Sequence, residues 1–135
     1  MKIGFTCGAF DLFHAGHVTM LQEAKSVCDY LIVGIQINPH VEKPEKNSPI
    51  QTIIERQIQV KACRYVDEII VYATVQDLED LLSMLPIDIR IIGTDHRGIW
   101  KSAREMCDRR NITVYYNKRD HRFSTTELRE RIKKS

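Results

Sequence analysis

The sequence predicts an α/β fold, in which a single domain over residues 1–135 contains a five-stranded parallel sheet flanked by helices. Short apolar runs alternate with segments of helical periodicity, which favours parallel strands joined by helical crossovers. The run YLIVGIQI at 30–37 is rich in β-branched residues, as in strands buried on both faces. A length of 135 residues suits one compact domain, and 43% hydrophobic residues can supply its core.

The first half of the chain is expected to contain strands at 2–7 and 30–37, each followed by a helix. Helical spacing in the first helix is carried by Val18, Leu21, Ala24 and Cys28. The segment 38–49 has three prolines and several charges, so it is a long loop and a candidate for function. The second helix is expected to begin at Ser48, with Pro49 in its first turn and Gln51 completing a capping box. Its apolar stripe would consist of Ile50, Ile53, Ile54 and Ile58.

The second half repeats the alternation with strands at 67–72, 87–93 and 112–116. A helix between the first two is marked by Leu78, Leu81, Leu82 and Leu85 and ends at Pro86. Another helix is expected over 99–110, and Ser124 and Glu127 form a capping box that opens a terminal helix.

Composition excludes several classes of protein. The net charge of +2, with no block of lysine or arginine, does not indicate nucleic-acid binding. Four isolated cysteines without a C-x-x-C pair do not indicate a zinc site. We see no signal peptide and no apolar stretch long enough to span a membrane, so a cytoplasmic protein with reduced thiols is expected.

Two histidines, His14 and His17, follow the first strand where a helix is expected to begin. If both belong to the first helical turn, they project to the same side, and Gly16 between them lets a phosphate approach the backbone closely. The helix N-terminus adds free N–H groups and the positive end of its dipole. These features predict a polyphosphate site, with a His-x-x-His metal site as the alternative.

The expected topology directs attention to the positions after Cys7, Ile92 and Tyr116, because ligands bind beyond the carboxyl ends of parallel strands. The sequence has no G-x-x-x-x-G-K-[ST] pattern and no G-x-G-x-x-G pattern after the first strand. P-loop enzymes and dinucleotide-dependent dehydrogenases are therefore disfavoured.

Gly-Ala-Phe-Asp at 8–11 and His-Ala-Gly-His at 14–17 resemble the first signature of the cytidylyltransferases, a branch of the HxGH nucleotidyltransferase superfamily. Arg119 followed by Phe-Ser-Thr-Thr at 123–126 resembles the second signature. With similar elements at 55–56, 64–68 and 93–95, the resemblance covers nearly the whole chain and is strongest to the glycerol-3-phosphate enzymes. It implies a Rossmann-like domain that joins CTP to a phosphorylated small alcohol, with glycerol 3-phosphate as the best single substrate. It also implies Mg²⁺ with the triphosphate, and a homodimer.

The resemblance also implies roles for individual residues. The catalytic residues would be His14, His17, Lys46 and Arg119. The residues that bind the nucleotide would be Gly8, Ala9, Phe10, Gly16, Arg64, Gly93, Asp95, Ser124 and Thr125. The residues that bind the acceptor would be Asp11, Lys43, Arg56 and Arg122. No protein ligand to a metal ion is assigned.

Several of these residues have a simpler structural interpretation. Arg56 and Arg64, eight residues apart on one helical side, could form ion pairs on a helix surface. Ser124 could serve only as a helix cap, the two lysines could lie on a solvated loop, and Cys7 is better explained as buried filler than as a catalytic group.

The chemistry of the implied reaction suits this residue set. The attacking phosphate oxygen is already ionised, so alignment and charge neutralisation are sufficient without a general base. The chain departs from the glycerol-3-phosphate pattern at Ala9, where threonine is usual, and at Arg122, where glycine is usual. A different phosphorylated or phosphonate acceptor, an adenylyltransferase and a non-catalytic nucleotide-binding module are the alternatives.

Overall fold

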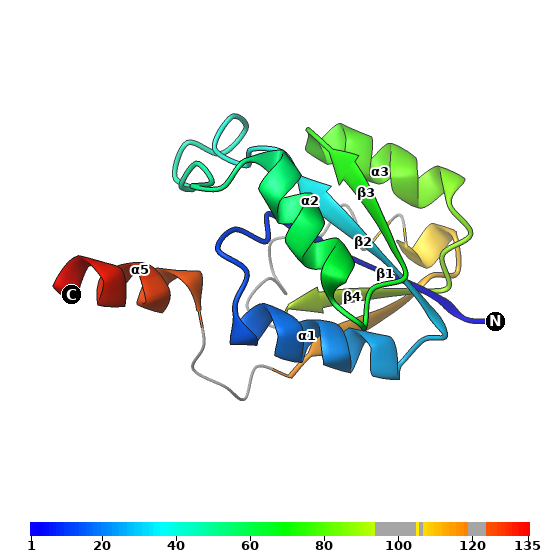
Figure 1. Ribbon diagram of the computed structural model, residues 1–135. Helices are drawn as coiled ribbons and strands as arrows, with labels where there is room; N and C mark the ends of the chain where they lie inside the picture. Colours follow the sequence, from blue (N-terminus) through cyan, green and yellow to red (C-terminus); the bar gives the residue numbers. More distant parts are fainter. Residues whose placement is uncertain (94–104, 106, 119–123) are drawn as a thin grey trace.

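The computed structural model describes residues 1–93, 105, 107–118 and 124–135. Its five strands form one sheet in the order β3-β2-β1-β4-β5, and neighbouring strands pair in parallel (Figure 1). The strands are β1 (Ile3–Gly8), β2 (Tyr30–Gln36), β3 (Glu68–Tyr72), β4 (Ile89–Gly93) and β5 (Thr113–Asn117). The predicted fold class is confirmed, and each predicted strand is present with its ends moved by at most two residues.

Helices cover both faces of the sheet, which explains why the strands are apolar on both sides. Helices α1 (Ala15–Ser26) and α2 (Ile53–Ala62) cover one face, where Leu21 and Val60 pack against β2 and β4. Helix α3 (Val75–Met84) covers the other face, where Leu78 and Leu82 pack with Phe5 of β1. Because β1 is central, the β1–α1 loop emerges in the middle of the carboxyl edge of the sheet, where it can meet segments from both faces.

The start of α2 differs from the prediction. The helix begins at Ile53, and its N-cap is Thr52 rather than Ser48. Thr52 Oγ1 accepts a hydrogen bond from Glu55 N at 3.1 Å, and Glu55 Oε1 accepts one from Thr52 N at 3.0 Å. The amides of Ile50 and Gln51 instead donate to Asp11 in the β1–α1 loop, so a tertiary contact holds the segment after Ser48 outside the helix.

Three of the four residues of the apolar stripe predicted for α2, Ile50, Ile54 and Ile58, are exposed in the single chain. Ile50, which lies before the helix, is 63% exposed, and Ile54 and Ile58 are each 65% exposed. The buried side of the helix is instead marked by Arg56 and Val60. Of the predicted stripe, Ile53 packs against the core, whereas Ile54 and Ile58 lie on the exposed side of the helix.

Helix α3 ends before Pro86, as predicted, and its N-cap is Thr74, whereas α1 ends two residues before Cys28. Of the helix predicted over 99–110, residues 105 and 107–109 are helical, and most of the rest lies outside the described residues. The N-cap of helix α5 (Thr125–Lys134) is Ser124, whose Oγ accepts from Glu127 N at 3.0 Å, so the serine half of the predicted capping box is present. The helix extends away from the sheet (Figure 1). None of the described helices is both long and apolar enough to cross a membrane.

Candidate active site

A cavity of about 570 Å³ lies at the carboxyl edge of the sheet. The ends of β1, β4 and β5 contribute Gly8, Gly93 and Asn117, which belong to the three places predicted from the strand pattern. The loop at 38–49, the start of α3 and the first turn of α5 complete the lining. The cavity therefore joins segments from both faces of the sheet.

The two histidines belong to the first turn of α1, as N-cap and third helical residue. His14 Nδ1 accepts a hydrogen bond from Gly16 N at 2.9 Å, and His17 Nδ1 accepts one from His14 N at 3.1 Å. A ring nitrogen that accepts carries no proton, so in each neutral ring the proton is on Nε2. The helix cap thus determines the tautomer of both imidazoles and leaves Nε2–H as the donor.

His17 is held in a neutral state by its surroundings. Its ring stacks on Phe13 at 5.4 Å between centroids and lies 5.4 Å from Phe10 and 4.0 Å from His14. Burial first, and then the electrostatic effect of neighbouring His14, lower the pKa of His17 to about 3, although Asp11 acts in the opposite direction. At neutral pH the His17 side chain is therefore an uncharged hydrogen-bond donor that borders the cavity.

Helix α5 reaches His14 through Thr125. The Thr125 hydroxyl lies 3.0 Å from His14 Nε2 and 3.4 Å from the Asp11 carbonyl oxygen. With the proton of His14 on Nε2, the ring donates to Thr125 Oγ1, and the hydroxyl donates to Asp11. This chain of contacts connects the two segments that carry the sequence signatures.

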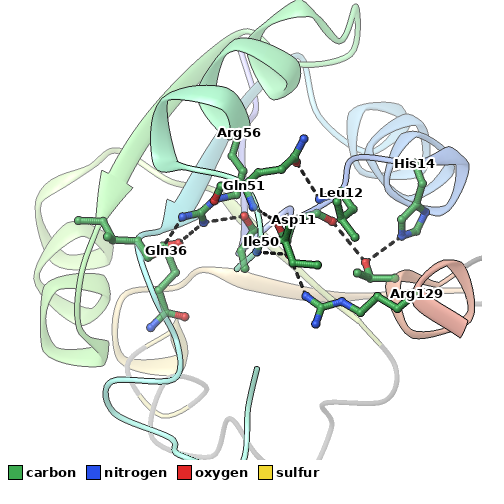
Figure 2. Close-up of polar contacts among 11 residues, drawn as sticks. Asp11, Leu12, His14, Gln36, Ile50, Gln51, Arg56 and Arg129 are labelled. Atoms are coloured by element: carbon green, nitrogen blue, oxygen red, sulfur yellow. Dashed lines mark hydrogen bonds and ion pairs between the residues drawn. The ribbon is translucent and has the colours of Figure 1, made fainter. Parts of the chain in front are cut away.

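Asp11 is only 7% exposed and holds three segments together. Its Oδ1 accepts from Gln51 N at 2.9 Å, while its Oδ2 accepts from Ile50 N and from Arg129 Nη2, each at 2.9 Å. Gln51 returns a bond, because its Oε1 accepts from the amide of Leu12 at 2.8 Å. These contacts connect the β1–α1 loop to the segment before α2 and to α5 (Figure 2).

The β1–α1 loop contains backbone strain on both sides of Asp11. Phe10 and Leu12 have φ angles of 52° and 51°, in the left-handed region that residues with a side chain seldom adopt. Such residues persist only where surrounding contacts hold them, and they concentrate at functional sites. The contacts of Asp11 supply that support here.

Arg56 is 2% exposed, and its guanidinium is bound by backbone carbonyl oxygens (Figure 2). Nη1 donates to Ala9 O at 3.0 Å and to Gln36 O at 2.7 Å, Nη2 donates to Ile37 O at 2.6 Å, and Nε donates to Gln51 O at 3.2 Å. The side chain thus joins the ends of β1 and β2 to the segment before α2. The surface ion pair considered for Arg56 is wrong, because the residue is buried, and its predicted contact with substrate stays a prediction.

The structure divides the predicted site residues into three groups. Those that line the cavity are Gly8, Ala9, Phe10, Asp11, His17, Lys43, Lys46, Gly93 and Thr125. Those that do not line it are His14, Gly16, Arg56, Arg64 and Ser124. Those outside the described residues are Asp95, Arg119 and Arg122.

Arg64 lies apart from the cavity. It follows the end of α2 and is exposed, with its guanidinium carbon 5.1 Å from the centre of the Tyr65 ring. Together with Phe13 and Gln59 it borders a separate open hollow of about 500 Å³ between α1 and α2. Because Arg64 does not line the cavity, its predicted role in binding the nucleotide stays a prediction.

Several residues that border the cavity were absent from the predicted set, among them Tyr72, Arg90, Asn117 and Arg129. Arg90 had a sequence signal, since it is a charge within the otherwise apolar strand residues 89–93. Tyr72 and Asn117 had none, because a tyrosine or asparagine at the end of a strand is ordinary, and Arg129 is one of several charges in a polar helix. Cys7, expected as buried filler, is partly buried and lines the cavity between Arg90 and Tyr72.

Comparison with known proteins agrees with this arrangement. A family model described as cytidylyltransferase-like matches residues 5–131. The chain is 30% identical to the glycerol-3-phosphate cytidylyltransferase of Bacillus subtilis over 132 residues, which covers 98% of each protein. It is 40% identical over 95 residues to the ethanolamine-phosphate cytidylyltransferase of Dictyostelium discoideum, but the match covers 70% of this chain and only 26% of that longer protein.

A solved structure supports the fold. The lipopolysaccharide core biosynthesis protein of Thermoplasma volcanium superposes with a TM-score of 0.70 at 23% identity, covering 86% of this chain and 93% of that protein. The paired histidines at the strand-to-helix junction, the family model and the relative matched along its whole length agree. The chain belongs to the cytidylyltransferase-like family.

Proposed function

We propose that the protein transfers the cytidylyl group of CTP to a phosphorylated small alcohol and releases pyrophosphate. The observation that carries the proposal is the pair of imidazoles at the start of α1, each with Nδ1 occupied by a backbone amide. Glycerol 3-phosphate is the first acceptor to test, since the Bacillus subtilis relative that matches the whole chain acts on it by name. An acceptor ending in an amine comes second, from the name of the Dictyostelium relative.

In the proposed reaction, a phosphate oxygen of the acceptor attacks the α-phosphorus of CTP. A new P–O bond forms, and the bond between the α-phosphorus and the α–β bridging oxygen breaks, so its electrons leave with pyrophosphate. The protein would supply alignment and neutralisation of the developing charge. His17 Nε2–H and the N-terminus of α1 are donors for the α-phosphate, and Lys43 and Lys46 of the long loop line the same cavity.

We propose that His14 exchanges its contact with Thr125 for one with the triphosphate when CTP binds. In the structure its Nε2 lies 3.0 Å from the Thr125 hydroxyl, an oxygen acceptor that a phosphate oxygen would replace. Arg119 and Asp95 complete the proposed set as a phosphate contact and a ribose or base contact.

Mg²⁺ would enter with CTP, because phosphate oxygens are the hard ligands that this ion prefers. It would neutralise negative charge on the triphosphate as pyrophosphate leaves. Within the part of the chain that the structure describes, no three His, Cys, Asp or Glu side chains gather as they would around a metal ion.

The test is pyrophosphate release measured with CTP, ATP, GTP and UTP, each with glycerol 3-phosphate and Mg²⁺. We expect CTP to be preferred and excess chelator to abolish turnover. A preference for ATP would replace the proposal by the adenylyl alternative. Failure with every nucleotide and acceptor would leave the nucleotide-binding module as the better assignment.

Substitution of either histidine separates catalysis from binding. His14→Ala and His17→Ala should each lower kcat by about 10²–10³, as expected when a donor to the transition state is lost. Both variants should keep the helical circular dichroism of the wild type. Near-normal kcat in both would show that the pair is structural.

A homodimer and a cytoplasmic location are parts of the same proposal. Ile54 and Ile58 form an exposed apolar strip along one side of α2, of the kind that an interface covers, and Ile50 just before the helix is also exposed. Arg64 does not line the cavity of its own chain, and it lies just beyond the C-terminal end of α2. A reaction that consumes CTP belongs where nucleoside triphosphates are available, which is the cytoplasm.

A further inference from the structure

The loop at 38–49 forms one wall of the active-site cavity and carries Lys43 and Lys46. Glu42 and Glu45 line the same wall, so its lysines and its carboxylates balance in charge. The wall as a whole therefore does not attract a triphosphate. Lys46 can neutralise charge on the phosphates only if its ammonium group is placed closer to them than the two carboxylates are.

The loop contains no helix or strand that would place Lys46, and the exposed His40 supplies the contact that closes it. The His40 ring nitrogen Nδ1 lies 2.6 Å from the Lys46 carbonyl oxygen. A carbonyl oxygen only accepts, so Nδ1 carries a proton and donates it to this bond. Within the closed loop, His40 N donates to Asn38 Oδ1 at 3.0 Å, and Lys43 N donates to Pro39 O at 3.0 Å. His40 thus fixes the backbone from which the Lys46 side chain extends.

Glu42 ties the closed loop to α3. Its Oε1 accepts a hydrogen bond from Val75 N at 2.8 Å, across 33 residues of the sequence. Val75 is the first residue of α3, so its amide has no acceptor within the helix, and the helix dipole favours a carboxylate at this end. The amides of Ala73 and Thr74 donate to Asp77, so Glu42 completes the cap of α3 from a distant segment.

The two ends of the loop are fixed as well, by the contacts of Arg56 and Asp11 described above. His40 does not line the cavity, so it can affect the reaction only through the loop that it closes. Lys46 is the residue of that loop whose carbonyl His40 binds and whose side chain borders the cavity. The contacts of His40 therefore lead to one residue of the site.

We propose that His40 is a positioning residue for the cytidylyl transfer. By closing the loop that Glu42 anchors to α3, it places the Lys46 ammonium at the triphosphate of CTP. The inference rests on the proposed function and adds two residues that act behind the cavity wall, His40 and Glu42.

Substitutions of His40 test the bond to Lys46 directly. His40→Leu removes the donor and should lower kcat/KM for CTP by about three- to tenfold, the usual effect of one hydrogen bond, with KM for glycerol 3-phosphate unchanged. His40→Asn should recover most of this loss, because its Nδ2 is bonded to Cγ just as Nδ1 is in histidine. His40→Gln carries its donor one bond farther from the backbone and should not recover it.

A double-mutant cycle with Lys46→Met separates positioning from a general contribution to stability. If His40 acts through Lys46, then His40→Leu should lower kcat/KM no further in the Lys46→Met background. Glu42→Met should behave in the same way, whereas Glu42→Gln keeps an accepting oxygen and should resemble the wild type. Arg110→Met is the matched control without effect on kcat/KM, since exposed Arg110 donates to Ser83 O at the same 2.6 Å outside the cavity.

Equal losses from His40→Leu in the wild-type and Lys46→Met backgrounds would overturn the proposal, as would an unchanged kcat/KM in folded His40→Leu. If no nucleotide and acceptor yield pyrophosphate, the proposed function fails, and calorimetric binding of CTP tests His40 in the same cycle. His40→Leu and Lys46→Met should then each weaken CTP binding, and the double variant should bind CTP as Lys46→Met does. Additive losses of CTP affinity would overturn the role of His40.

Discussion

The imidazoles of His14 and His17 perform two tasks with different ring nitrogens. Each Nδ1 accepts a backbone N–H of the first turn of α1, which is how a helix N-terminus is usually capped by an oxygen. Each Nε2–H then points away from the cap with its tautomer determined. The residues that begin the helix are therefore also the donors of the site, and the spacing of three residues serves both purposes.

The low pKa of His17 makes stability depend on pH. His17 binds a proton near pH 3 in the folded protein but near its ordinary pKa of 6.5 in the unfolded chain. Between these values the unfolded state holds the extra proton, so the free energy of unfolding falls as pH is lowered, by up to about 1.4 kcal/mol per pH unit. Asparagine binds no proton in this pH range, so the free energy of unfolding of His17→Asn should fall less steeply between pH 6.5 and pH 3.

Urea unfolding at several pH values measures this difference. Equal slopes for wild type and His17→Asn between pH 6 and 4 would contradict the depressed pKa of His17.

The buried Arg56 should be one of the most important residues for stability. Arg56→Met would leave the carbonyls of Ala9, Gln36 and Ile37 without their donor, at a cost on the order of 3 kcal/mol or more. Arg56→Lys should recover only part of this, since an ammonium cannot reproduce the planar fork. Urea unfolding at neutral pH measures both, with exposed Arg110→Met expected to change stability little; a loss below about 1 kcal/mol in Arg56→Met would contradict this role.

Helix α5 depends on a few polar contacts because none of its residues is buried. Thr125 contacts His14, and Arg129 contacts Asp11, at the end of the helix nearest the cavity. The rest of α5 extends from the body of the protein (Figure 1). The position of the second signature therefore depends on charge and hydroxyl contacts rather than on apolar packing.

Arg129→Met tests this attachment. The partly buried ion pair with Asp11 would be lost, so amides of α5 should exchange with solvent faster, by about tenfold for each 1.4 kcal/mol of docking energy lost. Hydrogen exchange followed by mass spectrometry measures the exchange rate of these amides. Lys133→Met is the matched control, because its pair with Glu130 is exposed and 3.9 Å long. Unchanged protection of α5 in Arg129→Met would show that other contacts hold the helix.

The start of α2 shows how two local signals compete. Ser48 and Thr52 are each followed three residues later by a residue suited to a capping box, Gln51 and Glu55. Local rules do not choose between them. Asp11, which is 39 and 40 residues away from the two amides it binds, selects the later start.

At the scale of the whole molecule, the exposed strip on α2 leads to a prediction about assembly. Ile54→Glu would place a charge in the proposed interface, so the variant should be a monomer at a concentration where the wild type is a dimer. Light scattering measures the mass. Met84→Glu is the control, because Met84 is 75% exposed on α3 and lies outside the strip. A wild-type protein that is monomeric and active at micromolar concentration would reject the dimer.

The order of elements and the place of the site could be predicted from the sequence because both depend on local patterns. Runs such as 30–37 are apolar enough to be strands buried on both sides, and the helical segments between them require parallel pairing. The histidine pair directly follows β1, so covalent connection alone puts it at the carboxyl edge of the sheet. The sequence by itself therefore determined the fold class, the edge that carries the site and the residues at the start of α1.

Only the tertiary structure decided which charged side chains are buried and what they contact. Arg56 and Arg64 are alike as sequence features, yet one is enclosed by carbonyls from three segments and the other is exposed. Asp11 meets Arg129 across 118 residues, and Arg90 meets Cys7 across 83. Such contacts depend on strand order and register, which bring distant segments together, whereas periodicity and capping describe only a residue's nearest neighbours along the chain.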